Sequence, residues 1–332
     1  MEIKLWRQTL EYHPAIGYRF IPGIKARIDS PEGGYLIRVN DSGFRCNHNF
    51  EKNKKNGVRR ILLFGDSFTA GDGVSNSKRY GDVLEREIPN LEVYNFGLPA
   101  TGTDQQYLAY KEYAVDIDHD LLIIAVFLEN IRRVVSHYRN FKDENGDIAC
   151  YAKPYFELDN GKLLLKNVPP PRHPIDASTL PDTEKEKIYR SSLYPAIGQF
   201  TRNLGIKDFI QKNFRYQPLP EYKSANNPAW IILRAILCSW IDNHPKPTLL
   251  LVIPQDQYIR GLANPSSYQT RFREIASRSK CTFHDPLPDF FRYSMEERKK
   301  ISLRDYHYSS SGHAALAASM SPIVKLLLNN NP

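Results

Sequence analysis

The stretch Ile61-Leu62-Leu63-Phe64-Gly65-Asp66-Ser67-Phe68-Thr69-Ala70-Gly71 joins an apolar run to a turn of small residues. Such a run, closed by a glycine turn, predicts a buried strand that ends at the edge of a sheet. Gly65 and the small residues after Ser67 keep bulk away from the serine hydroxyl. Ser67 is therefore a candidate nucleophile, although a single serine at a strand end is more often a turn or cap residue.

A histidine and a carboxylate stand close together near the other end of the chain. Asp305 and His307 are two residues apart, and in an extended segment residues i and i+2 point to the same side. We expect Asp305 to orient the His307 ring and to stabilise its charged form, as in serine hydrolases. His313 is expected in the first turn of the last helix, where it packs or caps. Serine, histidine and carboxylate together predict acyl transfer.

Two further segments offer hydrogen-bond donors for an oxyanion. The small-residue loop of residues 95–103 follows a predicted strand, and we expect the N–H groups of Gly97 and Ala100 to point toward Ser67. Glu129-Asn130 ends another predicted strand, where the Asn130 amide is a third candidate donor. Each donor of this kind stabilises a transition state by on the order of 3 kcal/mol. Taken singly, both segments are ordinary turns.

Two commoner glycine turns are excluded by the residues present. Thr69 stands where a G-x-S-x-G turn has its second glycine, which argues against that class of hydrolase. No lysine follows at the spacing of a phosphate-binding loop, which argues against a nucleotide-binding domain.

Composition indicates an ordinary globular protein. The 332 residues are 41% hydrophobic and 25% charged, and no apolar run reaches the length of a membrane span. The first residues lack the features of a signal peptide, and the four cysteines are scattered, so we expect reduced thiols, a cytoplasmic location and no metal or cofactor. The net charge of +8 includes a basic run at residues 52–60, which we interpret as a solvated loop rather than a nucleic-acid site.

Strand and helix patterns alternate along two parts of the chain. Strands are predicted at residues 58–64, 91–96, 120–128, 248–253 and near 281–283. Helices are predicted at 77–88, 103–115, 229–243, 267–278 and 311–329. This alternation predicts a three-layer α/β/α fold with about five parallel strands.

The remaining residues fall into two additions to this predicted core. Residues 1–57 are rich in turns and short extended pieces and predict a β-rich N-terminal extension. Residues 131–227 interrupt the core, which consists of residues 58–130 and 228–332. We expect this insertion to be largely helical, with one stretch between Thr183 and Arg215, and to form a wall or lid over the substrate. An ordinary surface elaboration is the alternative.

Taken together, these blocks resemble the SGNH (GDSL-type) hydrolase superfamily. Gly65-Asp66-Ser67 is similar to its first block, Asn95 to Gly102 to its second and Asn130 to its third. Two positions depart from the pattern, because Ala100 stands where the usual glycine donor falls and Asp305-x-His307 is one residue shorter than the usual Asp-x-x-His. Residues 40–45 and 129–133 are similar to a bacterial branch linked to polysaccharide or glycoconjugate modification.

The resemblance implies a flavodoxin-like fold and a serine esterase. Ser67 would be the nucleophile, His307 the base, Asp305 its carboxylate, and Ala100, Asn130 and Gly97 would form the oxyanion hole. The implied substrate is an acyl ester on a small molecule or saccharide. An O-acyltransferase using the same site, or a non-catalytic carbohydrate-binding protein on the same fold, are the alternatives. The sequence does not indicate the acyl chain, the alcohol or the oligomeric state.

Overall fold

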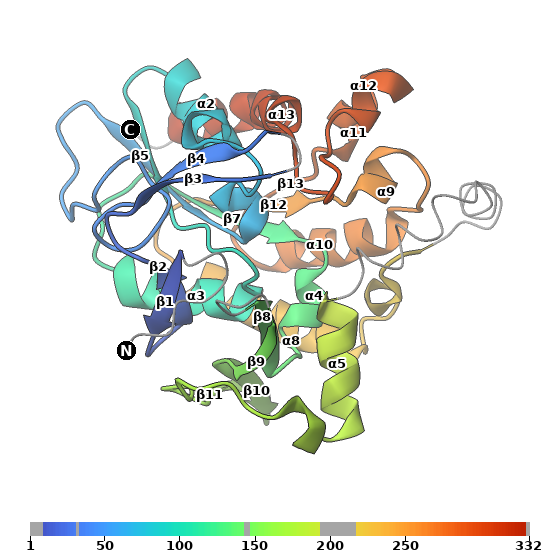
Figure 1. Cartoon of the computed structure of the whole chain (residues 1–332). Helices are drawn as coiled ribbons and strands as arrows, with labels where there is room; N and C mark the ends of the chain where they lie inside the picture. The colour runs from blue at the N-terminus through green and yellow to red at the C-terminus, as the bar shows by residue number, and fades with distance from the viewer. Residues whose placement is uncertain (1–8, 31–32, 143–146, 193–216, 330–332) are drawn as a thin grey trace.

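A five-stranded parallel sheet forms the centre of the computed structural model, which describes residues 9–30, 33–142, 147–192 and 217–329 (Figure 1). The strand order is β13-β12-β7-β5-β6, which is the flavodoxin-like order 2-1-3-4-5 when the strands are numbered along the chain. The predicted strands are confirmed as β5 (Arg59–Phe64), β6 (Leu91–Asn95), β7 (Leu121–Phe127), β12 (Thr248–Ile253) and β13 (Thr282–His284).

The sheet is covered on both faces, which explains its unbroken apolar strands. Every residue of β7 and β12 is buried, and the two strands pair in parallel with Ala125 opposite Leu251. Strands that have helices on both sides bury both of their faces, so they are apolar throughout and do not alternate with polar residues.

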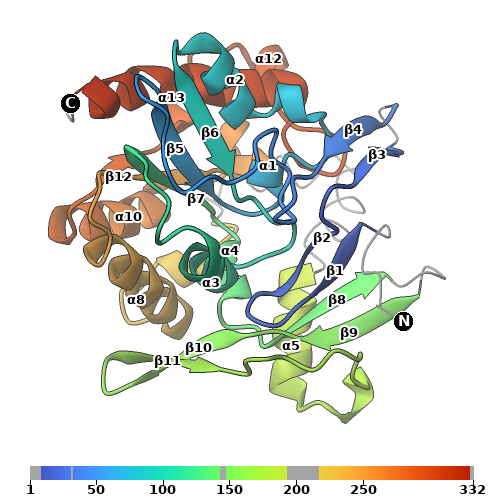
Figure 2. The same ribbon diagram turned by 90° about the vertical axis from the view of Figure 1, so that its left-hand side faces the viewer.

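Five main helices make the two outer layers (Figure 2). Helices α2 (Tyr80–Glu87) and α13 (Ser310–Asn329) cover one face, and α3 (Thr103–Tyr113), α8 (Pro228–Asp242) and α10 (Ser266–Arg278) cover the other. Helix α8 begins where it does because the Asn227 side chain accepts from the N–H groups of Ala229 and Trp230, with Pro228 at the first helical position. The expected three-layer α/β/α fold is confirmed.

Short helices lie at the strand ends and in the connections. They are α1 (Ser67–Ala70), α4 (Asn130–Arg133), α9 (Asp256–Ile259), α11 (Leu287–Phe290) and α12 (Met295–Lys299), with 3-10 turns at Asn76–Lys78, Ala177–Thr179 and Pro220–Tyr222. Helices α1 and α4 directly follow β5 and β7, so they begin at the carboxyl edge of the sheet.

The N-terminal region forms two hairpins and is tied to the core by a buried arginine. The hairpins are β1 (Leu10–His13) with β2 (Gly17–Phe20), and β3 (Lys25–Ile28) with β4 (Tyr35–Arg38). Arg45 is fully buried and donates to the carbonyl oxygens of Gly71 and Val74 at 2.8 Å. The N-terminal region is therefore hydrogen-bonded to the loop that follows α1.

The insertion differs from its predicted helical character. Its described part contains two β hairpins, β8 (Tyr138–Lys142) with β9 (Ile148–Ala152) and β10 (Tyr155–Asp159) with β11 (Lys162–Lys166), beside helix α5 (Asp182–Ser192). The predicted stretch 183–215 is helical to Ser192, and its remainder lies outside the described residues. The alternation of buried and exposed residues in these hairpins is too short and irregular to distinguish them from loops by pattern alone.

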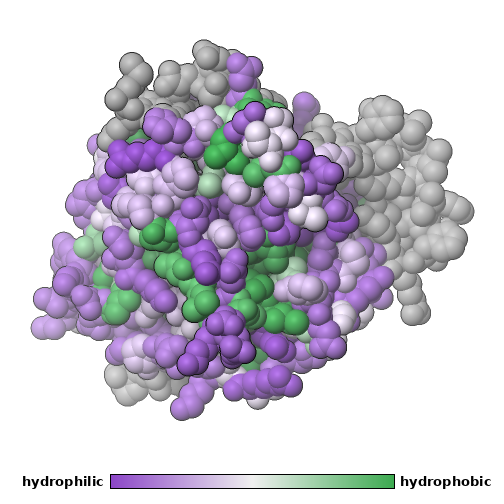
Figure 3. All heavy atoms as spheres, turned by 90° about the horizontal axis from the view of Figure 1, so that it is seen from below, coloured by the Kyte–Doolittle hydropathy of each residue, from purple (hydrophilic) through white to green (hydrophobic). Residues whose placement is uncertain are grey.

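The underside of the molecule, where the hairpins and α5 lie, mixes apolar and hydrophilic side chains (Figure 3). Leu164 and Leu165 of β11 and Ile148 of β9 are among the exposed large apolar residues. Within the part of the chain that the structure describes, no helix combines the length and apolar character needed to cross a bilayer.

The basic run is only partly solvated, which corrects its interpretation as a loop in water. Arg60 is fully buried on β5, pairs with Glu92 at 2.9 Å and lies over the Tyr94 ring. Lys54 and Arg59 both contact Asp120. These cations stabilise the amino edge of the sheet, remote from Ser67. All four cysteines are free thiols, as expected.

Candidate active site

Ser67 is the first residue of α1, at the carboxyl end of strand β5, which lies between β7 and β6 in the sheet. The Asp66 side chain caps this helix by accepting from the Phe68 N–H at 3.1 Å, and Gly71 ends it in the left-handed conformation. Gly65 has no room for a side chain, because an added Cβ would collide with Thr69. Ser67 is 4% exposed. The turn predicted from the glycine and small residues is therefore present.

His307 reaches Ser67 from a segment 240 residues away. Its Nε2 lies 2.9 Å from Ser67 Oγ, within hydrogen-bond distance. Its Nδ1 lies 3.1 Å from Asp305 Oδ2, an ion-pair contact without the direction of a hydrogen bond, and the Asp305 carboxylate is 56% exposed. The structure thus places Ser67, His307 and Asp305 together, with the His307 ring between the other two side chains.

The local geometry that joins Asp305 to His307 differs from the expected extended segment. Tyr306 has a φ of 71°, and the His307 N–H donates to Asp305 Oδ1 at 3.2 Å. The Leu303 N–H donates to the His307 carbonyl oxygen at 2.7 Å, which closes the turn. A tight turn, and not alternation along a strand, places the two side chains on one side.

Burial and charge act in opposite directions on His307. Burial disfavours its imidazolium, but the Asp305 carboxylate, with Asp72 and Asp66 farther away, outweighs burial and raises the pKa of His307 above its ordinary value. Neutral His307 with its proton on Nδ1 presents a lone pair at Nε2 to the Ser67 hydroxyl. This is the arrangement that a general base requires.

Asn130 offers a hydrogen-bond donor that has no acceptor in the described structure. It is fully buried as the first residue of α4, and its Oδ1 accepts from Arg133 Nη1 at 3.1 Å. That bond fixes the orientation of the amide, and among the described residues nothing accepts from Nδ2. A buried donor without a partner costs about 1–3 kcal/mol, so it is a feature that calls for a ligand atom.

Gly97 has a structural role that differs from the predicted one. Its N–H donates to Asn95 Oδ1 at 2.8 Å and is therefore not directed to an oxyanion. An added Cβ at Gly97 would collide with the backbone of Thr69 and Ala70, so the glycine allows the loop to pack against α1. Asn95 Nδ2 completes this contact by donating to the Thr69 carbonyl oxygen at 2.9 Å.

Ala100 occupies a backbone conformation that favours glycine. Its φ is 61°, in the left-handed region, and it lies half-buried in the turn between β6 and α3. Flanking residues hold this turn, because Pro99 O accepts from the Tyr18 hydroxyl at 2.8 Å and Thr101 O accepts from Arg133 at 3.2 Å. Ala100 therefore adopts the left-handed backbone conformation that a glycine at this position would adopt more easily.

Arg133 connects three parts of the site, and its role is not evident from the sequence. Its Nη1 donates to Asp66 at 2.6 Å, as well as to Asn130 and to the Thr101 carbonyl. One guanidinium therefore joins the helix of the nucleophile, the loop of Ala100 and the Asn130 amide. The only signal in the sequence is the spacing of three residues from Asn130, which on a helix puts both side chains on one face.

Other candidates lie away from this cluster. His313 is fully buried, accepts from the Tyr80 N–H at 3.3 Å and stacks on the Tyr80 ring, as its predicted packing role requires. In the described ranges, no group of three or more histidine, cysteine, aspartate or glutamate side chains is arranged to hold a metal ion.

No family model and no curated protein matches this chain. Several solved structures are similar to it. A member of the lipolytic protein G-D-S-L family from Veillonella parvula is 10% identical, with a TM-score of 0.41 over 81% of this chain and 99% of that one. A lipase/acylhydrolase from Enterococcus faecalis is 15% identical, with a TM-score of 0.39 over 83% and 98%. A carbohydrate acetylesterase family member from Sinorhizobium meliloti is 11% identical, with a TM-score of 0.36 over 82% and 100%.

Proposed function

We propose that this protein is a serine esterase of SGNH type that hydrolyses an O-acyl ester, with a carbohydrate or glycoconjugate as the alcohol. The observation that carries the proposal is the 2.9 Å contact between His307 Nε2 and Ser67 Oγ at the carboxyl edge of the sheet. The contact with Asp305 and the Asn130 Nδ2, which has no acceptor among the described residues, support the same assignment, because they supply an orienting carboxylate and an oxyanion donor.

The first half of the reaction forms an acyl-enzyme. His307 Nε2 takes the Ser67 proton as Oγ bonds to the acyl carbon, and the carbonyl oxygen becomes an oxyanion. The N–H groups of Ser67 and Ala100 and the Asn130 amide hold this oxyanion. The bond from the acyl carbon to the alcohol oxygen then breaks, and His307 gives its proton to the departing alcohol.

The second half restores the free enzyme. A water molecule attacks the acyl carbon while His307 Nε2 takes one of its protons. The bond to Ser67 Oγ breaks, the serine recovers a proton from His307, and the carboxylic acid leaves. Arg133 is a positioning residue in both halves, since it contacts Asp66, Thr101 and Asn130 and not the reacting atoms.

The test compares the wild-type protein with Ser67→Ala on p-nitrophenyl acetate and on a serine-reactive phosphonate. We expect wild-type hydrolysis and one phosphonate adduct on Ser67, detected by mass spectrometry of peptides, and neither in Ser67→Ala. Ser277→Ala, which changes an exposed serine of α10 outside the site, is the control and should react as wild type. A wild-type protein without turnover or adduct would contradict the esterase.

An O-acyltransferase is the second candidate, because a sugar hydroxyl in place of water would accept the same acyl group. A phosphonate adduct without steady hydrolysis, together with turnover on adding a saccharide acceptor, would favour this reaction. A non-catalytic binding protein would show neither adduct nor turnover.

A further inference from the structure

The turn that contains the proposed oxyanion donor Ala100 has an alternative conformation in which its central peptide is reversed. Pro99 and Ala100 occupy the two central positions of this turn, and the φ of 61° at Ala100 is that of a type II turn. A type I turn accepts proline at the same position and gives the next residue an ordinary negative φ. The two types differ mainly in the orientation of the peptide that joins their central residues, so a reversed Pro99–Ala100 peptide is sterically accessible.

The orientation of this peptide decides which of its two polar groups is available to an oxyanion, because the C=O and the N–H of a trans peptide point to opposite sides. The turn lies against the residues before Ser67, since the Leu98 N–H donates to the Gly65 carbonyl oxygen at 3.1 Å. Among the described residues, none accepts from the Ala100 N–H. Reversing the peptide would bring the Pro99 carbonyl oxygen to the side that this N–H now occupies, where it would repel an oxyanion.

Tyr18 fixes the orientation of the peptide through the Pro99 carbonyl. The Tyr18 hydroxyl, on strand β2 of the N-terminal hairpin, donates to Pro99 O at 2.8 Å. The Pro99 oxygen is thereby turned toward the Tyr18 hydroxyl, and the Ala100 N–H points away from it. Burial raises the pKa of Tyr18 well above its ordinary value, so the hydroxyl keeps its proton and remains a donor.

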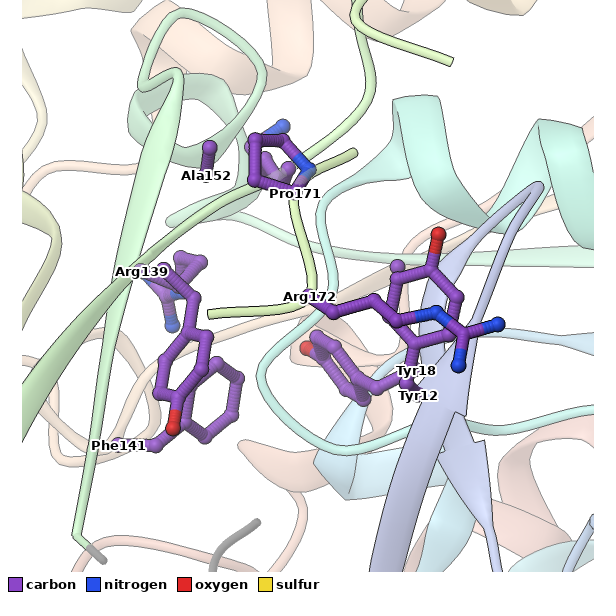
Figure 4. Close-up of a pocket in the computed structure, with 10 residues that line it drawn as sticks. Tyr12, Tyr18, Arg139, Phe141, Ala152, Pro171 and Arg172 are labelled. Atoms are coloured by element: carbon purple, nitrogen blue, oxygen red, sulfur yellow. The ribbon is translucent and has the colours of Figure 1, made fainter. Parts of the chain in front are cut away.

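The ring of Tyr18 is held by both additions to the fold. It is 3% exposed and packs edge-on against Phe141 of β8, with 4.9 Å between the ring centroids. Figure 4 shows Tyr12 and Tyr18 of the hairpin and, across a narrow cavity, Arg139 and Phe141 of β8. The cavity measures about 20 Å³, which is room for a water molecule and little else. This packing restricts the Tyr18 side chain and so keeps its hydroxyl on the Pro99 oxygen.

Ala100 makes this support necessary. A type II turn places its second central residue in the left-handed region, where glycine is unstrained and alanine is not. Alanine therefore favours the reversed peptide, and the hydrogen bond from Tyr18 opposes that preference. We propose that Tyr18 is a positioning residue that holds the Pro99–Ala100 peptide with its N–H available to the oxyanion. This inference rests on the proposed esterase for its catalytic meaning, whereas the orientation of the peptide is measured separately.

The test compares Tyr18→Phe with the wild-type protein on p-nitrophenyl acetate. The change keeps the ring and leaves Pro99, a buried residue, without the donor to its carbonyl oxygen. We expect kcat to fall about tenfold with little change in KM, because an oxyanion donor acts in the transition state. Tyr12→Phe is the matched control, since it removes a hydroxyl of the same hairpin that donates to Pro170 O at 3.0 Å, and it should leave kcat unchanged.

Rescue by Ala100→Gly distinguishes this role from a merely structural one. Glycine adopts a positive φ without strain, so adding Ala100→Gly to Tyr18→Phe should restore at least about half of the wild-type kcat. A general loss of packing around Tyr18 would not respond to a glycine in the turn. Wild-type kcat in Tyr18→Phe, or a loss that Ala100→Gly does not reduce, would overturn the proposal.

Crystal structures of the single and double variants separate this proposal from the esterase. We expect Tyr18→Phe to show the reversed peptide with a negative φ at Ala100, and the double variant to show the type II turn. A reversed peptide in Tyr18→Phe, with no hydrolysis by the wild-type protein, would support the role of Tyr18 in the turn and contradict the esterase. Hydrolysis by the wild-type protein, with the type II turn intact in Tyr18→Phe, would overturn the proposal and leave the esterase standing.

Discussion

The Asn130 amide combines a fixed orientation with a free donor. Its Oδ1 is held by Arg133, and in the described structure its Nδ2 has no acceptor. A donor held in this way loses nothing to reorientation when an oxyanion forms, and preorganised donors of this kind accelerate acyl transfer in serine hydrolases.

We therefore expect Asn130→Ala to lower kcat for p-nitrophenyl acetate by about 10²–10³-fold with a smaller change in KM, as for the loss of one oxyanion donor. Asn226→Ala, at an exposed asparagine before α8, is the control and should leave kcat unchanged. A rise in KM with kcat unchanged would mean that Asn130 binds substrate and transition state equally.

The pH dependence follows from the raised pKa of His307. Only the neutral ring accepts the Ser67 proton, so activity should fall as the pH drops through a pKa above the ordinary value of a histidine. Because Asp305 raises this pKa, Asp305→Asn should shift the acidic limb of kcat/KM to lower pH and also reduce the plateau. A limb that stays in place in this variant would exclude Asp305 as the partner of His307.

At the scale of elements, the site depends on how closely the loop after β6 packs on α1. Gly97 contacts the backbone of Thr69 and Ala70, where an added Cβ would collide. Gly97→Ala should displace α1 and lower both the unfolding temperature and kcat. Gly161→Ala, in the β10–β11 turn with open space around it but a φ of 80°, should lower stability by about 1 kcal/mol without changing kcat.

Arg133 links α4 to α1 through a buried charge. Arg133→Met should lower the free energy of unfolding by about 3–5 kcal/mol, because it leaves the Asp66 carboxylate buried without its partner. Asp66→Asn added to Arg133→Met should recover part of that loss in denaturant titrations. Additive losses would show that the two residues do not interact.

The whole molecule divides into a part that the sequence predicts well and a part that it does not. The core strands and main helices follow from long apolar runs and helical periodicity, and Ser67, His307 and Asp305 follow from their residue types and positions. The roles of Gly97 and Arg133 cannot be predicted from the sequence, because they depend on tertiary contacts. Gly97 packs against the backbone of α1, and Arg133 pairs with the Asp66 carboxylate. The hairpins of the insertion, such as β10–β11, are short and have no regular alternation, so the sequence pattern does not distinguish them from helix or loop.

At this scale the N-terminal region supports the candidate site, since Arg45 donates to the carbonyl oxygens of Gly71 and Val74 just after α1. Arg45→Met should therefore reduce kcat as well as stability, although Arg45 lies in a different segment from every proposed catalytic residue. Arg27→Met, at an exposed arginine of β3, is the control and should affect kcat little.

The contact between Ser67 and His307 spans 240 residues, and this separation has a consequence for folding. Strands β5, β6 and β7 are complete by Phe127, so during synthesis the proposed nucleophile, Ser67, is made long before its proposed base, His307. Contacts so distant in sequence form late, because the chain between them must first be ordered. If Ser67 is the nucleophile, a growing or partly folded chain carries it without its base, and Ser67 becomes reactive only when the segment of His307 packs against the sheet.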